Sequence, residues 1–194
     1  MNRTYKIGLL AAVLYIIIEL VIVALGYNHS EEIHIIAWGI NTMCLLVAVT
    51  YSILSEFNFE LAKGKGVSLL HDIKSGLRTV SVYAVTIAFF IFAYYQWIDP
   101  EYPEIRRERF LAGVENKQFE EQAKAKMEAA PEMYEGKSID DLRDMNEEST
   151  NMILSSSFKI IFPITLFSLL LLGMIYTFII TGFNRLVLVK LLVK

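Results

Sequence analysis

Four long apolar stretches alternate with polar segments along this chain of 194 residues. The apolar stretches cover residues 7–26, 33–54, 80–98 and 158–183. A hydrocarbon layer about 30 Å thick is crossed by roughly 20 helical residues, because in lipid only a helix satisfies its own backbone hydrogen bonds. Each stretch is long enough to do so. The pattern therefore predicts an all-α integral membrane protein with four transmembrane helices.

Composition agrees with this prediction. Hydrophobic residues make up 55% of the chain and charged residues 20%, and the mean hydropathy is +0.45. A soluble domain carries about a quarter charged residues. No cluster of basic residues indicates a nucleic-acid partner. The first apolar stretch exceeds the roughly 15 residues of a signal-peptide core, so we interpret it as a retained span.

The basic residues predict the orientation of the spans, because Lys and Arg near span ends are retained in the cytoplasm. They precede the first span, lie between the second and third, and follow the fourth: Arg3, Lys6, Lys63, Lys65, Lys74, Arg78, Arg185, Lys190 and Lys194. The turn at 27–32 has no basic residue, and most acidic residues lie between 98 and 157. We expect a bacterial cytoplasmic (inner) membrane protein with cytoplasmic N and C termini.

This topology divides the chain into three parts. Residues 1–98 hold the first three transmembrane helices, with a cytoplasmic interfacial loop at 55–79 in which residues 68–77 form a short amphipathic helix or an ordinary basic loop. Residues 99–157 form an extracytoplasmic acidic helical segment. Residues 158–194 hold the fourth transmembrane helix and a basic cytoplasmic tail.

The acidic segment is predicted to be a helical hairpin, since it is rich in the strong helix formers Glu, Lys, Ala, Gln and Met. Pro103 suits the first turn of one helix, and Pro131 would end it. Ser138 and Asp141 have the spacing of a capping box at the start of a second helix. The turn is expected at 134–137, and the second helix is expected to continue toward the fourth span.

Glu19 is the one ionisable residue well inside a predicted span, and a charge there costs several kcal/mol. At 1.5 Å per residue, Asn41 and Thr165 lie at a similar depth. The first interpretation is structural: a neutral Glu19 hydrogen-bonded to Asn41 or Thr42 would hold two helices in register. The second is that Glu19 binds or relays a proton or cation, although it lacks the second carboxylate or basic partner that a relay normally shows.

The sequence predicts no catalytic residue, no metal site and no cofactor. His71 beside Asp72 is interpreted as an interfacial polar pair. The acidic residues after Ser138 lack the glycine turn of a calcium loop and are interpreted as a solvated helix face. Six charged residues of the outer segment are candidate partner contacts: Arg106, Arg107, Arg109, Asp140, Asp141 and Asp144.

Two stretches resemble an uncharacterised bacterial family of four-helix membrane proteins, a domain-of-unknown-function family frequent in Bacteroidota. Residues 63–76, KGKGVSLLHDIKSG, are similar to that family's turn and glycine-marked entry to its third span. Residues 93–102, AYYQWIDPEY, are similar to its aromatic exit from that span. The resemblance implies four spans with a charged helical insert before the last, and it implies no activity.

Two functions are expected from these features. The first is a non-enzymatic accessory or assembly subunit of a larger envelope complex, in contact with the bilayer and with a protein partner or a second copy of itself. The second is a small oligomeric transporter or channel using Glu19 and Asn41. The long acidic segment and the few polar residues within the spans favour the first.

Overall fold

The computed structural model describes residues 3–27, 30–62, 68–101, 104–105, 108, 117–155 and 157–188. Within these ranges the chain forms six α-helices and no strand. The helices are α1 (Arg3–Ala24), α2 (Glu31–Ala62), α3 (Leu69–Ala93), α5 (Lys117–Ala129), α6 (Ile139–Ser155) and α7 (Ser157–Phe183). Two π-helical turns, Tyr94–Ile98 and Asn184–Leu188, continue α3 and α7. The chain divides into two compact units: Met1–Ile91 with Phe162–Lys194, and Phe92–Ile161.

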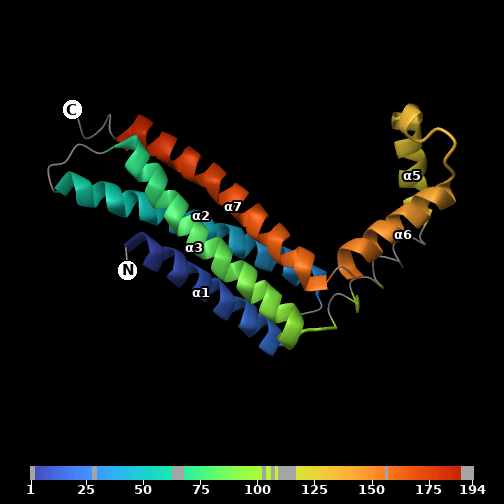
Figure 1. The fold of residues 1–194 in the computed structure, drawn as a ribbon, viewed down its shortest axis with the longest axis horizontal. Coiled ribbons are helices and arrows are strands. Elements are labelled where there is room, and N and C mark those ends of the chain that lie inside the picture. Colours follow the sequence, from blue (N-terminus) through green and yellow to red (C-terminus); the bar gives the residue numbers. More distant parts are fainter. Residues whose placement is uncertain are drawn as a thin grey trace. The chain divides into compact units, whose positions relative to one another are not determined.

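The first unit is an antiparallel bundle of α1, α2, α3 and the greater part of α7 (Figure 1). The beginnings of α1 and α3 and the ends of α2 and α7 lie at one end of the bundle, which we call the polar end. Apolar side chains from all four helices form the core: Ala12, Leu45, Val49, Ile53, Val80, Tyr83, Ile87 and Leu169. Burial of these side chains between helices fixes which face of each helix points inward.

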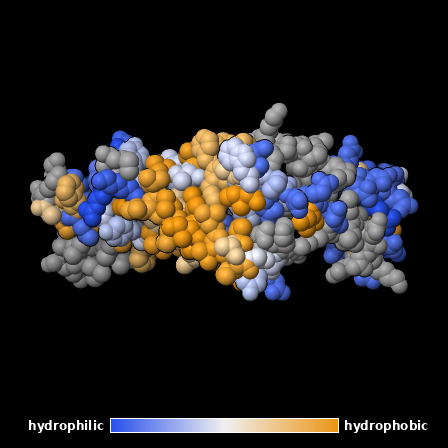
Figure 2. Space-filling model, turned by 90° about the horizontal axis from the view of Figure 1, so that it is seen from below, coloured by the Kyte–Doolittle hydropathy of each residue, from blue (hydrophilic) through white to orange (hydrophobic). Residues whose placement is uncertain are grey.

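The outer faces of the bundle are apolar as well. Figure 2 shows hydrophobic residues over the middle of the bundle and hydrophilic residues gathered at its polar end. Side chains as large as Ile35, Leu10 and Phe167 are 68 to 74% exposed. Four helical segments are long and apolar enough to cross a membrane: Arg3–Ala24, Glu32–Ala62, Leu69–Ile98 and Ile161–Leu186. The predicted all-helical fold with four long apolar helices is confirmed.

The helices reach further than the apolar stretches do. Helix α2 continues to Ala62 and α3 begins at Leu69, so most of the segment expected as an interfacial loop at 55–79 is helical and belongs to the bundle. Asp72, Ser75 and Thr79 are polar, so the hydropathy pattern does not predict a buried helix here. All three side chains are nevertheless buried between helices. The predicted short helix at 68–77 is instead the first part of α3.

The second unit contains α5 and α6, which contact each other. Ala123 of α5 is buried, and Arg143 of α6 lies 3.7 Å from a carboxylate oxygen of Glu120. Helix α5 ends at Ala129, just before Pro131. The predicted capping box is confirmed, because the Ser138 backbone N–H donates to Asp141 Oδ2 at 2.6 Å and the Asp141 N–H donates to Ser138 Oγ at 3.1 Å.

Candidate functional site

Glu19 and Asn41 are both buried, and their described hydrogen bonds lead to different partners. The Tyr15 hydroxyl, one turn earlier in α1, donates to Glu19 Oε2 at 3.2 Å. The Tyr83 hydroxyl of α3 donates to Asn41 Oδ1 at 2.6 Å and to its backbone oxygen at 3.0 Å. His34 of α2 is close enough to act electrostatically on Glu19. Asn41 thus connects α2 to α3, and Glu19 has a basic neighbour that its sequence position does not indicate.

The other predicted site residues are dispersed. The Thr42 hydroxyl donates to the Trp38 carbonyl of its own helix at 3.0 Å, and Thr165 is buried in α7. Asp140, Asp141 and Asp144 are exposed on α6. The three candidate contacts Arg106, Arg107 and Arg109 lie outside the residues that the structure describes.

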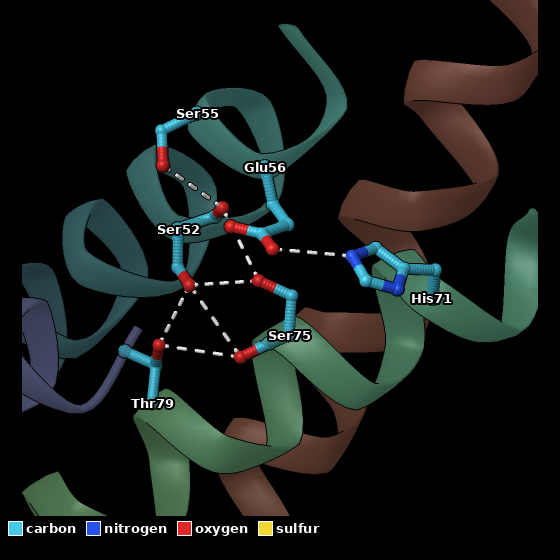
Figure 3. A network of polar contacts seen from close by, with 6 residues as sticks. All are labelled: Ser52, Ser55, Glu56, His71, Ser75 and Thr79. Atoms are coloured by element: carbon cyan, nitrogen blue, oxygen red, sulfur yellow. Dashed lines mark hydrogen bonds and ion pairs between the residues drawn. The ribbon is translucent and has the colours of Figure 1, made fainter. Parts of the chain in front are cut away.

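The structure instead gathers buried polar side chains at the polar end. Ser52 of α2 and Ser75 of α3 lie with their hydroxyl oxygens 3.0 Å apart, and the Thr79 hydroxyl lies 2.7 Å from that of Ser52 (Figure 3). Thr79 also lies within hydrogen-bonding distance of the Thr4 carbonyl of α1, at 3.1 Å. We call Thr4, Ser52, Ser75 and Thr79 the hydroxyl cluster. Their polar contacts join α1, α2 and α3 in one register, which apolar packing alone would not specify.

Small residues allow the helices to approach at this end. A Cβ atom added to Gly8 would collide with the backbone oxygen of Thr79, so α1 passes directly against α3 there. A Cβ atom on Gly76 would lie 2.6 Å from the Thr177 methyl carbon of α7. Close approach of this kind lets hydroxyls reach partners on a neighbouring helix.

An ion pair closes the same end of the bundle. Arg185, in the π-helical turn after α7, donates from Nε and Nη2 to Asp72 Oδ2 at 3.1 and 2.9 Å. The Asp72 side chain is fully buried, and that of Arg185 is 22% exposed. Asp72 Oδ1 and both polar side-chain atoms of Asn184 are buried, and they have no hydrogen-bond partner among the residues that the structure describes. Because buried polar groups of this kind destabilise a fold, their concentration at one end marks a candidate functional region.

Three ionisable side chains meet beside the hydroxyl cluster. Glu56 and Glu60 lie one turn apart on α2, and His71 lies near the start of α3. His71 Nε2 is 3.2 Å from Glu56 Oε1. One ligand atom from each of the three residues lies within 4.8 Å of the others. We call this set the Glu–His group; carboxylates and an imidazole in this arrangement can bind a cation.

The sequence contains a signal for the polar end that hydropathy obscures. Asp72, Ser75, Gly76 and Thr79 follow the i, i+3, i+4, i+7 spacing of one helix face, but the residues of that face are polar or small. Adjacent in the sequence, His71 and Asp72 are predicted to form a polar pair. In the structure they diverge, since Asp72 bonds to Arg185 and His71 to Glu56.

Fold and site together define an all-helical protein with four helices apolar enough to cross a membrane and a polar interior at one end of its bundle. The chain belongs to the family described as "Protein of unknown function (DUF4199)", whose model matches residues 6–185. The resemblance to an uncharacterised family is therefore confirmed. Comparison with curated proteins and with solved structures gives no match.

Proposed function

We propose that this chain is a non-enzymatic, multi-pass protein of the bacterial cytoplasmic membrane that works as an accessory or assembly subunit of a larger envelope complex. The apolar outer faces of α1, α2, α3 and α7 support insertion in a bilayer. Arg3, Lys6, Lys74 and Arg78 near the polar end support its placement, with both termini, on the cytoplasmic side.

The proposed docking role rests on the acidic character of the second unit. Residues 92–161 hold 15 of the 21 acidic residues but 9 of the 18 basic ones. Carboxylates of α5 and α6 face solvent, and the Asp140 side chain is 83% exposed. Met133 is 74% exposed beside them. A charged, partly apolar surface of this kind favours a basic protein partner, because complementary charge guides association.

In-cell crosslinking tests this role directly. A photoreactive residue at Asp144, exposed on α6, is expected to capture one defined protein, whereas the same probe at Phe178, exposed on α7, is expected to meet lipid. Extraction in mild detergent should then copurify that protein in fixed proportion. Deletion of 104–148 should release it. A deleted chain that keeps its partner would show that the second unit does not dock it.

The transporter hypothesis stays as a second candidate because Glu19 is a buried carboxyl of α1 and His34 of α2 lies near it. In a homo-oligomer, Glu19 and Asn41 would then line the path. Reconstituted vesicles test this, since Glu19→Gln should abolish ion or proton flux while Glu32→Gln, at an exposed position, should preserve it. Flux that is unchanged in Glu19→Gln eliminates this candidate.

A further inference from the structure

We propose that Glu56, Glu60 and His71 form a binding site for a divalent transition-metal ion at the polar end of the bundle. The sequence predicts no metal site, because the two glutamates and the histidine come from segments with no recognisable ligand spacing. The fold brings them together from two helices. This inference is independent of the proposed accessory role, since the site lies in the bundle and the docking surface in the second unit.

The spacing of the ligand atoms suits an ion. Two donor atoms that each lie about 2.1 Å from a tetrahedral ion are roughly 3.4 Å apart. His71 Nε2 and Glu56 Oε1 are already 3.2 Å apart. The third ligand atom lies within 4.8 Å of both, so a side-chain rotation of Glu60 suffices to close the site. Glu56 and Glu60 share one face of α2, which is the face that meets α3 at His71.

The site is built on a fixed helix pair. One turn from Glu56, Ser52 contacts Ser75 and Thr79 of α3 through hydroxyl oxygens (Figure 3). These contacts set the distance between α2 and α3 before any ion binds. A pre-organised ligand set of this kind binds metal without reordering the backbone.

The donor set selects the class of ion. Imidazole nitrogen suits zinc, copper, iron and nickel, and carboxylate oxygen suits manganese, whereas magnesium and calcium prefer ligand sets made only of oxygen. The Glu56 side chain is 13% exposed and that of His71 is 36% exposed, so an ion would reach them from solvent. Three protein ligands leave a coordination position open. We therefore expect a zinc or manganese ion held by the three side chains and water.

Equilibrium dialysis of the full chain in mild detergent tests the site. Chelator-treated protein is dialysed against Zn²⁺ or Mn²⁺ with excess Mg²⁺, and bound metal is measured by elemental analysis. We expect one ion per chain. Glu60→Gln and His71→Asn should each weaken binding tenfold or more, since even residues that only orient a metal ligand change affinity about 10- to 100-fold.

Glu128→Gln, an exposed carboxylate on α5, is the matched control and should bind as the native chain does. Glu60 lies in the last turn of α2, so its amide variant keeps the bundle intact if His71→Asn does not fold. Cobalt absorption supplies a second measurement, because ligand-field bands should appear in the native chain and vanish in Glu60→Gln. A native chain that retains no ion, or equal retention by all variants, would overturn the proposal.

Discussion

Tyr83 connects α2 to α3 in the middle of the bundle, where it is fully buried. Its hydroxyl gives both described hydrogen bonds to Asn41, so Tyr83→Phe takes a donor from a buried amide without changing the packing. We expect a loss of about 1 to 2 kcal/mol in the free energy of unfolding, measured with denaturant in detergent micelles. Tyr51→Phe, at a 55% exposed tyrosine of α2, is the control and should lose little. An equal loss in both would contradict a role for the Asn41 contact.

The buried ion pair of Asp72 with Arg185 allows a second mutational test of stability. Asp72→Asn leaves the guanidinium without its carboxylate, and breaking a buried pair costs about 3 to 5 kcal/mol. We expect the lower end of that range, because the Arg185 side chain is 22% exposed and reaches water. The double variant Asp72→Asn with Arg185→Gln should recover part of the loss. Additive losses in this double-mutant cycle would show that the two side chains are not coupled.

Helix α1 depends on a close approach that one methyl group would prevent. In a helix, Gly→Ala alone stabilises by about 1 kcal/mol. At Gly39 of α2 no described atom beyond its chain neighbours and the backbone of its own helix lies within 4 Å of the added carbon, so Gly39→Ala should keep or raise the melting temperature. At Gly8 the same carbon meets the backbone of Thr79, which cannot rotate away, so Gly8→Ala should lower it. Thermal unfolding in one detergent compares the two; equal shifts would refute the contact.

The start of α6 gives a prediction that depends on pH. The Ser138 backbone N–H and hydroxyl donate to Asp141 and hold the pKa of that carboxyl below its ordinary value of 3.8. A carboxyl with a lowered pKa stabilises the helix fully above the ordinary value, and this stabilisation is lost as pH falls through the lower folded pKa. The protection of the first-turn amides of α6, taken relative to the intrinsic exchange rate at each pH, should therefore decrease below about pH 4.

Ser138→Ala is the matching variant for the same cap. Loss of an N-cap side chain costs about 1 kcal/mol. Exchange in the first turn of α6 should be faster at neutral pH than in the native chain, and its remaining pH dependence should be weaker. Exchange in α5 is the internal control and should not change. A native pH profile in Ser138→Ala would show that the serine hydroxyl does not support the Asp141 charge.

At the level of elements, local patterns predict what local forces determine. Apolar runs longer than 18 residues predict the four long helices, and the spacing of Ser138 and Asp141 predicts the cap. The polar start of α3 is predicted only as a short helix at 68–77 or a loop, because Asp72 and Ser75 lower the hydropathy of a segment that is nonetheless buried. Their burial depends on the partner helix, and Asp72 meets Arg185 across 113 residues.

The candidate site shows the same limit. Rise per residue predicts a similar depth for Glu19 and Asn41, and in the structure both side chains are buried. Depth does not specify direction around the helix axis. Asn41 accepts its hydrogen bonds from Tyr83 of α3, and Glu19 accepts one from Tyr15 of its own helix. The Glu–His group was missed because its residues come from two helices whose relative rotation no single segment encodes.

The whole molecule yields a test of the proposed orientation. Cys44 is the only cysteine, so Cys44→Ser gives a background free of thiols. In this background Ser30→Cys should react with a membrane-impermeant maleimide on intact spheroplasts. Ser68→Cys, in the connection at the polar end, should react only after the membrane is permeabilised. The opposite labelling pattern would reverse the orientation, and labelling of both in intact spheroplasts would contradict four spans.

The pairing of Asp72 with Arg185 has a consequence for the order in which the protein is made. Asp72 is synthesised 113 residues before the guanidinium that neutralises it. Until Arg185 is synthesised, the nascent chain contains the Asp72 carboxylate, which becomes buried in the folded bundle, without the guanidinium that pairs with it. We therefore expect α1 to α3 to reach their final packing only after Arg185 has been synthesised. We expect completion of the bundle to wait for its last helix.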